Sequence, residues 1–350
     1  MFRKILPVRT WISGLLIIVG LGLVFYFVLG RGGKSALTDE LLTRELILAR
    51  SQTANLTTFF QARARSIVAL SKLSSMKHRN EETVQDLDGF VEQWSKDGLI
   101  GGIILTNKDG LVELNSNISG TRDTGASVAD RDYYLQVKDE IIKDEYFIGK
   151  PVISRMGGSK GQTIVPVAAP VYQNQLFGGV VAVSVILEPL TERFLSLMKI
   201  SDSTEVYLIN QNGDLLYSNL TPDSVGSNIF ESPQANSFLG GQTLSNQMKA
   251  ALAANQEGKL ETAYLNSGGS LEVRLIAYSP VKLETQNWLL VIASPIQDVV
   301  NLTTPAYIRQ AAVLILVSLS LLAFGIITTR NMKANTEKEE QASAKTPHTD

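Results

Sequence analysis

Residues 103–115 read IILTNKDGLVELN, and residues 207–218 read YLINQNGDLLYS. Each stretch runs from an apolar segment into Asn-x-x-Gly and then into a second apolar segment. A glycine-bearing turn between two apolar segments is typical of a β-hairpin. Three residues of the first stretch recur in the second at a constant offset of 103, namely Leu105, Asn107 and Gly110 as Leu208, Asn210 and Gly213. The chain is therefore predicted to contain the same hairpin twice.

A second repeat is centred on two prolines. Pro170 and Pro280 each lie between two strand-like segments, at an offset of 110, and the same offset aligns Ser184 with Ser294. Because proline has no N–H to give to a sheet, we expect both prolines in turns between strands. Two repeats in the same order indicate a duplicated module, each copy an antiparallel sheet with helices on its faces. The expected fold class is α+β, with two such modules.

Composition excludes several classes of protein. The chain has 350 residues, of which 44% are hydrophobic and 19% charged, and its formal net charge is −2. These values favour a packed core over general disorder and give no sign of nucleic-acid binding. There is no cysteine, the two histidines (His78 and His348) are far apart, and no G-x-S-x-G or phosphate-loop motif occurs. The usual zinc frameworks and nucleophile motifs are thus missing, so we expect no enzyme activity, no metal and no cofactor.

Two uncharged segments of 20 residues, Trp11–Gly30 and Gln310–Thr329, are long enough to cross a bilayer as helices. The alternatives are a cleaved signal peptide for the first segment and a buried core helix for the second. Basic residues mark the cytoplasmic side of a span. Residues 330–338 carry three of them, whereas Arg309 stands alone before the second segment. Both termini are therefore predicted to be cytoplasmic.

This topology divides the chain into an outer region and two cytoplasmic ends. Residues 1–10 form the cytoplasmic N-terminus, and residues 330–350 form a short disordered tail that is too small to bury a core. Residues 31–309 would lie outside the cytoplasm, in the periplasm or beyond the cell. We therefore expect a two-pass protein of the inner (plasma) membrane with an extracytoplasmic domain.

The outer region begins with a long amphipathic helix, expected over residues 37–75. Its apolar residues recur at helical spacing without an intervening proline or glycine: Leu41, Leu42, Leu46, Leu56, Phe59, Phe60, Ile67, Leu70 and Leu73. Such a stripe can form the seam of a parallel homodimer or cover a sheet, and both roles can hold together. A second helix is expected over Glu82–Lys96, ending at Gly98. A membrane-distal module would then occupy about residues 78–200, and a membrane-proximal module residues 201–300.

Three segments of the distal module resemble a known family. Residues 130–134 read DRDYY, residues 146–172 read YFIGKPVISRMGGSKGQTIVPVAAPVY, and residues 176–185 read LFGGVVAVSV. They resemble the double Cache sensor domains of bacterial membrane receptors, in which two PAS-like modules on a long helix lie between two membrane spans. The resemblance covers residues 37 to about 305. It implies that a small molecule binds in the distal module and that a signal passes to the membrane.

The resemblance also implies site residues. In the amino-acid-binding members of the family, an arginine and an aromatic residue two positions later hold the ligand carboxylate, and an aspartate on the return strand holds the ammonium group. Arg131, Tyr133 and Tyr134 match the first element. Ser184 stands at the aspartate position and Ala126 at the position of an expected tyrosine. Because the partner of an ammonium group is missing, we rank organic acids above amino acids as ligands.

Physical reasoning from the same residues agrees in part. Asp130 suits an N-cap, which would place Arg131 in the first helical turn, where free N–H groups favour an anion. An arginine there also offers a bidentate fork to a carboxylate. The alternative is that Arg131 pairs with Asp130 and Asp132. Tyr133 and Tyr134 differ by ~100° around a helix, so one of them is expected in the core.

The predicted ligand site therefore has five residues: Arg131, Tyr133, Tyr134, Tyr146 and Ser184. Arg155, beside Gly157 and Gly158, is expected in a turn rather than at the site. Since the short tail holds no output domain, we expect the receptor to signal through a cytoplasmic or membrane partner. The alternatives are a fragment of a longer receptor and a structural or solute-binding envelope protein that uses the two modules as a spacer.

Overall fold

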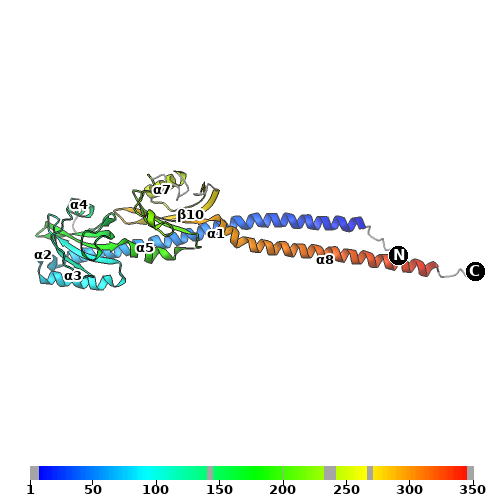
Figure 1. Ribbon diagram of the computed structural model, residues 1–350, viewed down its shortest axis with the longest axis horizontal. Helices are drawn as coiled ribbons and strands as arrows, with labels where there is room; N and C mark the ends of the chain where they lie inside the picture. Colours follow the sequence, from blue (N-terminus) through cyan, green and yellow to red (C-terminus); the bar gives the residue numbers. More distant parts are fainter. Residues whose placement is uncertain (1–7, 140–144, 200, 232–241, 266–270, 345–350) are drawn as a thin grey trace, which may run out of the picture. The chain divides into compact units, whose positions relative to one another are not determined.

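Two antiparallel sheets lie along one long helix (Figure 1). The structure, a computed structural model, describes residues 8–139, 145–199, 201–231, 242–265 and 271–344. The chain divides into two compact units, Leu41–Ile296 and a second unit made of both chain ends. Both sheets belong to Leu41–Ile296, so the two predicted modules form one compact unit.

Helix α1 (Val8–Ser71) has one buried side along residues 42–70. The buried residues recur every three or four positions: Leu42, Glu45, Ala49, Thr53, Leu56, Phe60, Ala64, Ile67 and Leu70. Much of this side belongs to an apolar core that includes Val183 of the distal module and Leu290 of the proximal module. A long helix over this region is confirmed, but it ends at Ser71 rather than at residue 75, and Leu73 of the expected stripe lies outside it and is 43% exposed. Its apolar stripe covers the sheets, which is one of the two roles expected for it.

The distal module contains a six-stranded sheet in the order β2-β1-β6-β5-β3, with β4 also paired to β5. Its elements in chain order are α2 (Ser74–His78), α3 (Glu81–Trp94), η1 (Ser95–Asp97), β1 (Ile100–Thr106), β2 (Val112–Asn117), α4 (Asp132–Asp139), β3 (Phe147–Ile148), β4 (Val152–Ile153), η2 (Gly157–Ser159), β5 (Thr163–Gln173), β6 (Leu176–Ile186), α5 (Leu187–Leu195) and η3 (Ser196–Met198). The expected helix over residues 82–96 corresponds to α3 with η1, and Gly98 (φ 73°) ends it as predicted.

The distal sheet has a different covering on each face. α3 packs on the α1 side, where Leu87 and Val91 join the apolar core shared with α1. α4 packs on the opposite side, where Tyr134 and Val137 contribute to a separate apolar cluster. The strands lie between these helical layers, as Figure 1 shows. The α4 side of the sheet carries most of the predicted site residues.

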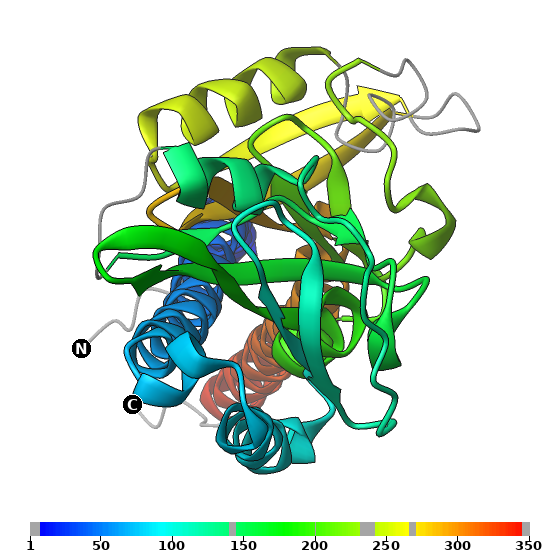
Figure 2. The same ribbon diagram turned by 90° about the vertical axis from the view of Figure 1, so that its left-hand side faces the viewer.

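The proximal module repeats the distal strand order. Its elements are β7 (Glu205–Asn210), β8 (Leu215–Ser218), η4 (Pro222–Ser224), α7 (Gln242–Ala254), β9 (Gly258–Leu265), β10 (Leu271–Lys282) and β11 (Asn287–Pro295). The sheet runs β8-β7-β11-β10-β9, which corresponds strand for strand to β2-β1-β6-β5-β3. α7 covers the proximal sheet on one face (Figure 2).

The two hairpin turns have the same hydrogen bonds, which confirms the duplication. The side-chain oxygen of Asn107 accepts the N–H groups of the residues two and four positions later, at 2.9 and 3.0 Å. Asn210 does the same, at 2.9 Å for both. Gly110 (φ 80°) and Gly213 (φ 95°) take the left-handed conformation that the turn requires. An asparagine that bonds its own following backbone fixes such a turn locally, which is why the sequence revealed it.

The prediction that the two prolines lie in turns is wrong. Pro170 lies inside β5 and Pro280 inside β10. Pro170 faces Val180 of β6. The N–H of Val180 points away from β5 and donates to Thr106 Oγ1 of β1, at 2.9 Å. The missing N–H of Pro170 therefore points away from β6, to the outer side of β5 where β3 no longer reaches. Pro280 likewise lies past Tyr278, the last residue of β10 that pairs with β9.

The alignment of Ser184 with Ser294 is wrong by one residue. Ser184 faces Gly102 across β6 and β1, and the proximal counterpart of Gly102, Glu205, faces Ala293. Ala293 is therefore the structural equivalent of Ser184. A shift of one residue moves a side chain to the other face of a sheet. Ser294 accordingly does not repeat the position of Ser184, and its hydroxyl lies 3.0 Å from that of Thr204.

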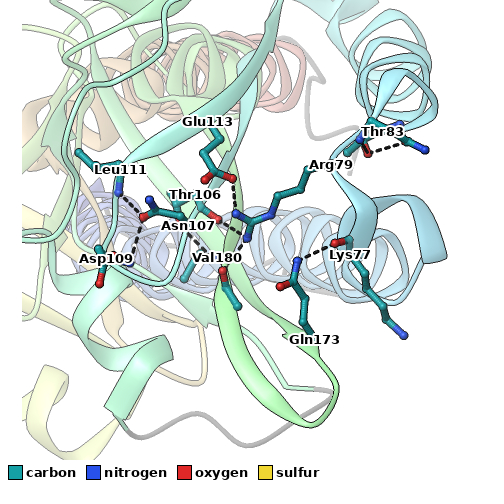
Figure 3. Close-up of polar contacts among 12 residues, drawn as sticks. Lys77, Arg79, Thr83, Thr106, Asn107, Asp109, Leu111, Glu113, Gln173 and Val180 are labelled. Carbon is teal, nitrogen blue, oxygen red and sulfur yellow. Dashed lines mark hydrogen bonds and ion pairs between the residues drawn. The ribbon is translucent and has the colours of Figure 1, made fainter.

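Arg79 connects three strands at one end of the distal sheet (Figure 3). Its guanidinium donates to the carbonyl oxygens of Thr106 (3.0 Å) and Gly178 (2.5 Å) and pairs with Glu113. The register of β1 and β2 shifts between Leu105 and Thr106, so the ladder is interrupted where Arg79 binds. Arg79 also has a left-handed backbone (φ 55°) that ends α2.

Helix α8 (Ile296–Ala344) contains a segment that could cross a membrane. By length and composition, this is Ile308–Lys338, which includes the predicted second span. Within the part of the chain whose residues are described, it is the one helix that meets this criterion. The predicted first span lies within the helical range of α1 and stays a prediction. The tail was expected to be disordered, but α8 continues to Ala344, in line with the good helix formers Ala, Glu and Lys that residues 333–344 contain.

Candidate ligand site in the distal module

The start of α4 is fixed by the carboxylate of Asp132. Its Oδ1 accepts the N–H of Tyr133, and its Oδ2 accepts the N–H of Lys150, both at 2.8 Å. The carbonyl oxygen of Arg131 accepts the first helical N–H groups, at 3.1 Å. Asp130 was predicted to cap this helix, but the helix begins two residues later, so Asp130 is not the capping residue.

Asp130 is instead bound by Arg155. Both nitrogens of the Arg155 guanidinium donate to the Asp130 carboxylate, at 2.7 and 2.6 Å. This pairing lowers the pKa of Asp130 to about 2, mainly because the hydrogen bonds from Arg155 stabilise the ionised carboxylate. Arg155 also donates to the carbonyl oxygen of Ser127, at 3.1 Å. The arginine that was expected in an ordinary turn thus ties two loops together beside Arg131.

Within the described part of the chain, Arg131 has no direct carboxylate partner. One guanidinium nitrogen donates to the carbonyl oxygen of Ile153 at 2.9 Å, and no Asp or Glu among the described residues lies within 4.0 Å of it. Arg131 makes no direct ion pair with Asp130 or Asp132, whose carboxylates accept other donors, but its charge still helps to lower the pKa of Asp130. A half-buried guanidinium that has remaining donors and no carboxylate within 4.0 Å among the described residues is suited to binding an anion.

Tyr133 is the second residue of α4, and its side chain packs in the apolar cluster beneath this helix. Its side chain is 5% exposed, and burial raises the pKa of its hydroxyl, so the phenol stays neutral at physiological pH. A β-carbon on Gly149 would lie 3.0 Å from Tyr133 Cβ and 2.7 Å from Pro166 Cγ, so any larger residue here would force its neighbours to shift. Pro166 faces Ser184 across β5 and β6. The sheet register thus brings Tyr133 and Ser184 to the same end of the α4 face.

Tyr134 and Tyr146, the other two predicted residues, are engaged by partners of their own. Tyr134 is 1% exposed, its hydroxyl donates to the carbonyl oxygen of Lys108 at 2.5 Å, and its ring packs edge-on against Phe177. Tyr133 belongs to the same buried apolar cluster as Tyr134, so both adjacent tyrosines pack in the core, where only one was expected. Tyr146 packs against the core on the α1 side and hydrogen-bonds Glu284, and burial raises its pKa. Of the five predicted residues, only Tyr146 lies on the α1 side, and the others lie on the α4 side, with Tyr133 and Tyr134 both buried there.

Two buried asparagines on β2 were missed. Asn115 and Asn117 face Ile104 and Gly102, so they share the α4 face with Ser184. Asn117 donates to Asn115 Oδ1 at 3.3 Å, while Asn115 Nδ2 is buried and has no hydrogen-bond partner among the described residues. Their alternation in an edge strand was a usable signal, because a period of two puts both on one face.

A groove with a volume of about 1040 Å³ runs between the distal strand β4 and the proximal strand β8. Its lining includes Ile153, whose carbonyl oxygen binds Arg131. Three carboxylates, Glu188, Glu192 and Asp214, and one ammonium group also line it. The groove is therefore lined by the residue whose carbonyl oxygen binds Arg131, and its charged lining is more negative than positive.

The comparison with protein families matches the description Cache domain over residues 33–303. The chain belongs to the Cache domain family. The duplicated sheets, the long first helix and the matched range agree with the double Cache architecture expected from the sequence, and this recognition is confirmed. The family consists of sensory domains of membrane receptors, so the residues at the start of α4 belong to a sensor fold.

Solved structures share the fold of this Cache domain at low sequence identity. The structure named Methyl-accepting Chemotaxis protein X has 17% identity and a TM-score of 0.56, with 74% of this chain and 99% of that chain covered. The sensory domain of the Campylobacter jejuni chemoreceptor Tlp3 (CcmL) with isoleucine bound has 16% identity and a TM-score of 0.53, with 77% and 97% covered. An extracellular ligand binding receptor from Desulfohalobium retbaense has 13% identity and a TM-score of 0.53, with 70% and 39% covered. A comparison with curated proteins finds no match.

Proposed function

We propose that the chain is a membrane-anchored sensor whose distal Cache module binds a small anion, with Arg131 as the anchor. The observation that carries the proposal is the state of Arg131: its guanidinium has no carboxylate within 4.0 Å among the described residues, although Asp130 and Asp132 flank it in sequence. A carboxylate ligand would complete the charge pairing that the protein leaves open.

The surroundings of Arg131 support a carboxylate and give no anchor for an ammonium group. Asp130 is neutralised by Arg155, and both oxygens of Asp132 accept backbone N–H groups. The return strand presents Ser184 where amino-acid-binding relatives carry an aspartate. We therefore place organic acids ahead of amino acids, although one similar structure is a chemoreceptor with isoleucine bound.

The membrane context completes the proposal. Spans at residues 11–30 and 310–329 would hold residues 31–309 outside the cytoplasm with both termini inside, and the receptor would act as a homodimer on a cytoplasmic or membrane partner. Apolar segments of 20 residues and the basic residues after the second span support this arrangement. Because the chain contains no cysteine, single cysteines can test it. Labelling from outside should reach position 211 and spare position 340 in intact cells.

The ligand is tested on the full-length protein in lipid nanodiscs. A thermal-shift screen compares acetate, L-lactate, succinate and citrate with L-isoleucine, other amino acids and putrescine, and calorimetry follows for each compound that stabilises the protein. We expect an organic acid to bind with the highest affinity. Tightest binding by putrescine, which has no acidic group, would overturn the anion proposal.

One observation favours the alternative of a structural envelope protein. The α4 face of the distal sheet contains an apolar cluster, which includes Ile104, Val112, Val180 and Met156. A face filled in this way leaves less room for a ligand than an open cavity would. The same screen separates the two functions, since a spacer would be stabilised by none of the acids, amino acids or amines.

A further inference from the structure

We infer that Gln286 of the proximal module is a positioning residue for the ligand site of the distal module, an inference that rests on the proposed function. Gln286 is 4% exposed and lies in the turn between β10 and β11. Its Nε2 donates to the carbonyl oxygen of Gly149, in the distal module, at 2.7 Å. Its Oε1 accepts the indole N–H of Trp288 at 3.2 Å. Both ends of the side chain are therefore fixed.

The neighbouring Thr285 binds the same distal segment. Its hydroxyl donates to the carbonyl oxygen of Ile148 at 2.7 Å, and the same hydroxyl oxygen accepts the N–H of Ile148 at 3.2 Å. β3 has only two residues and pairs with β5 on one side. The proximal turn thus supplies the polar partners on the other side of β3, which a strand this short would otherwise lack.

The segment held by the turn continues directly into the ligand site. Lys150 follows Gly149, and its N–H donates to Asp132 Oδ2 at 2.8 Å. Asp132 in turn accepts the N–H of Tyr133, next to Arg131. Gly149 also lies close to Asp132, because a β-carbon built on Gly149 would be 3.3 Å from Asp132 Oδ1. Gln286 is therefore separated from the start of α4 by one backbone segment of two residues.

The other side of Gln286 is rigid. Trp288 is completely buried, and its ring meets Phe60 of α1 edge-on, with ring centroids 5.4 Å apart. Glu284 has a left-handed backbone (φ 62°) that sets the tight turn. A turn anchored to α1 in this way can hold β3 in one position. Removing the Gln286 donor would leave the carbonyl oxygen of Gly149 buried without that partner, so the Gly149–Lys150 segment would shift or loosen.

The test uses the full-length protein in nanodiscs and two isosteric changes, Gln286→Met and Thr285→Val. The first readout is amide hydrogen exchange without ligand. We expect exchange to rise by roughly 2- to 30-fold at Ile148, Lys150 and Tyr133, the size of effect seen for residues that couple two sites. The second readout is the affinity for the tightest binder among acetate, L-lactate, succinate and citrate, which should fall within the same range.

Met248→Ala is the matched control. Met248 is completely buried on α7, in the apolar cluster on the other face of the proximal sheet. This change destabilises the proximal module without removing a contact to β3. If it raises exchange at Lys150 as much as Gln286→Met does, the effect is general destabilisation and the positioning role is wrong.

The two readouts separate this inference from the proposed function. Raised exchange at Lys150 supports the inference even if no acid binds, in which case only the proposed ligand class fails. Unchanged exchange and affinity in both Gln286→Met and Thr285→Val would overturn the inference while leaving the ligand site in place. Because coupling is reciprocal, a bound acid should also slow exchange at Thr285 and Gln286.

Discussion

Asp130 and Arg155 form a bidentate ion pair, with N–O distances of 2.7 and 2.6 Å, although Arg131 is the neighbour of Asp130 in sequence. The pair keeps the Asp130 carboxylate away from the guanidinium that we propose as the ligand anchor. Arg155→Met should free Asp130 to compete with the ligand for Arg131, so the affinity for an organic acid should fall severalfold in calorimetry. The double variant Asp130→Asn/Arg155→Met should recover most of the lost affinity. No recovery would mean that Arg155 itself contacts the ligand.

The same pair predicts a pH dependence of stability. Arg155 lowers the pKa of Asp130 to about 2, below the value of about 3.9 for an unfolded aspartate. A carboxylate with a lowered pKa contributes stability above its unfolded pKa, and the contribution is lost as the pH falls through the folded pKa. The difference in thermal midpoint between the parent and Asp130→Asn should therefore be constant from pH 7 to 5 and close between about pH 4 and 2. A difference that closes above pH 5 would contradict the pairing.

Arg131→Ala should remove most of the ligand affinity. Truncating one partner of a buried ion pair typically costs about 2–5 kcal/mol, or roughly 30- to several-thousand-fold in the dissociation constant. The measurement is calorimetry with the acid found by the screen. Arg122→Ala is the control, because Arg122 lies in the same module and its ion pair with Asp88 is half exposed. Equal affinity in Arg131→Ala and the parent would show that the anchor is assigned incorrectly.

Arg79→Met should destabilise the distal module more than a surface arginine variant does. The change removes the donor from two buried backbone carbonyl oxygens, each of which costs about 1–3 kcal/mol when it is left without a partner. It also removes the partner of Glu113, whose side chain is 38% exposed and which therefore contributes less. Urea unfolding should therefore show a lower midpoint with an unchanged slope. Arg122→Met provides the comparison, since an exposed pair typically contributes about 0–1 kcal/mol. Equal midpoints for the two variants would contradict the bracing role of Arg79.

The features that the sequence predicted well are local ones. The turns at Asn107 and Asn210 are set by side chains that bond their own following backbone, so a short motif revealed both hairpins and the duplication. The stripe of α1 was visible for the same reason, because helical spacing depends on nearby residues only. The motif of five residues that points to Arg131 is also local, and the role of Arg131 as a ligand anchor stays a prediction.

The features that the sequence missed depend on distant segments. Pro170 fits inside β5 only because the neighbouring strand β3 is too short to reach it. The partner of Asp130 lies 25 residues away in another loop, so proximity in sequence suggested Arg131 instead. Tyr146 was expected at the ligand site, but the register of β3 on β5 turns Phe147 toward the α4 face and Tyr146 toward Glu284 of the proximal module. No local pattern contains that information.

A homodimer contact along α1 cannot use the buried stripe and must use another side of the helix. Leu56 is completely buried against the sheets, whereas Ile47 is 57% exposed on the same helix. A symmetric contact along α1 must therefore use the side that carries Ile47. In the cysteine-free parent, Ile47→Cys should form an intermolecular disulfide in oxidised membranes, and Leu56→Cys should not. Membrane confinement raises the effective concentration, so the experiment needs native membranes rather than a detergent extract. A cross-link at neither position 47 nor the other exposed positions 43, 50, 54 and 58 would count against a homodimer built along this helix.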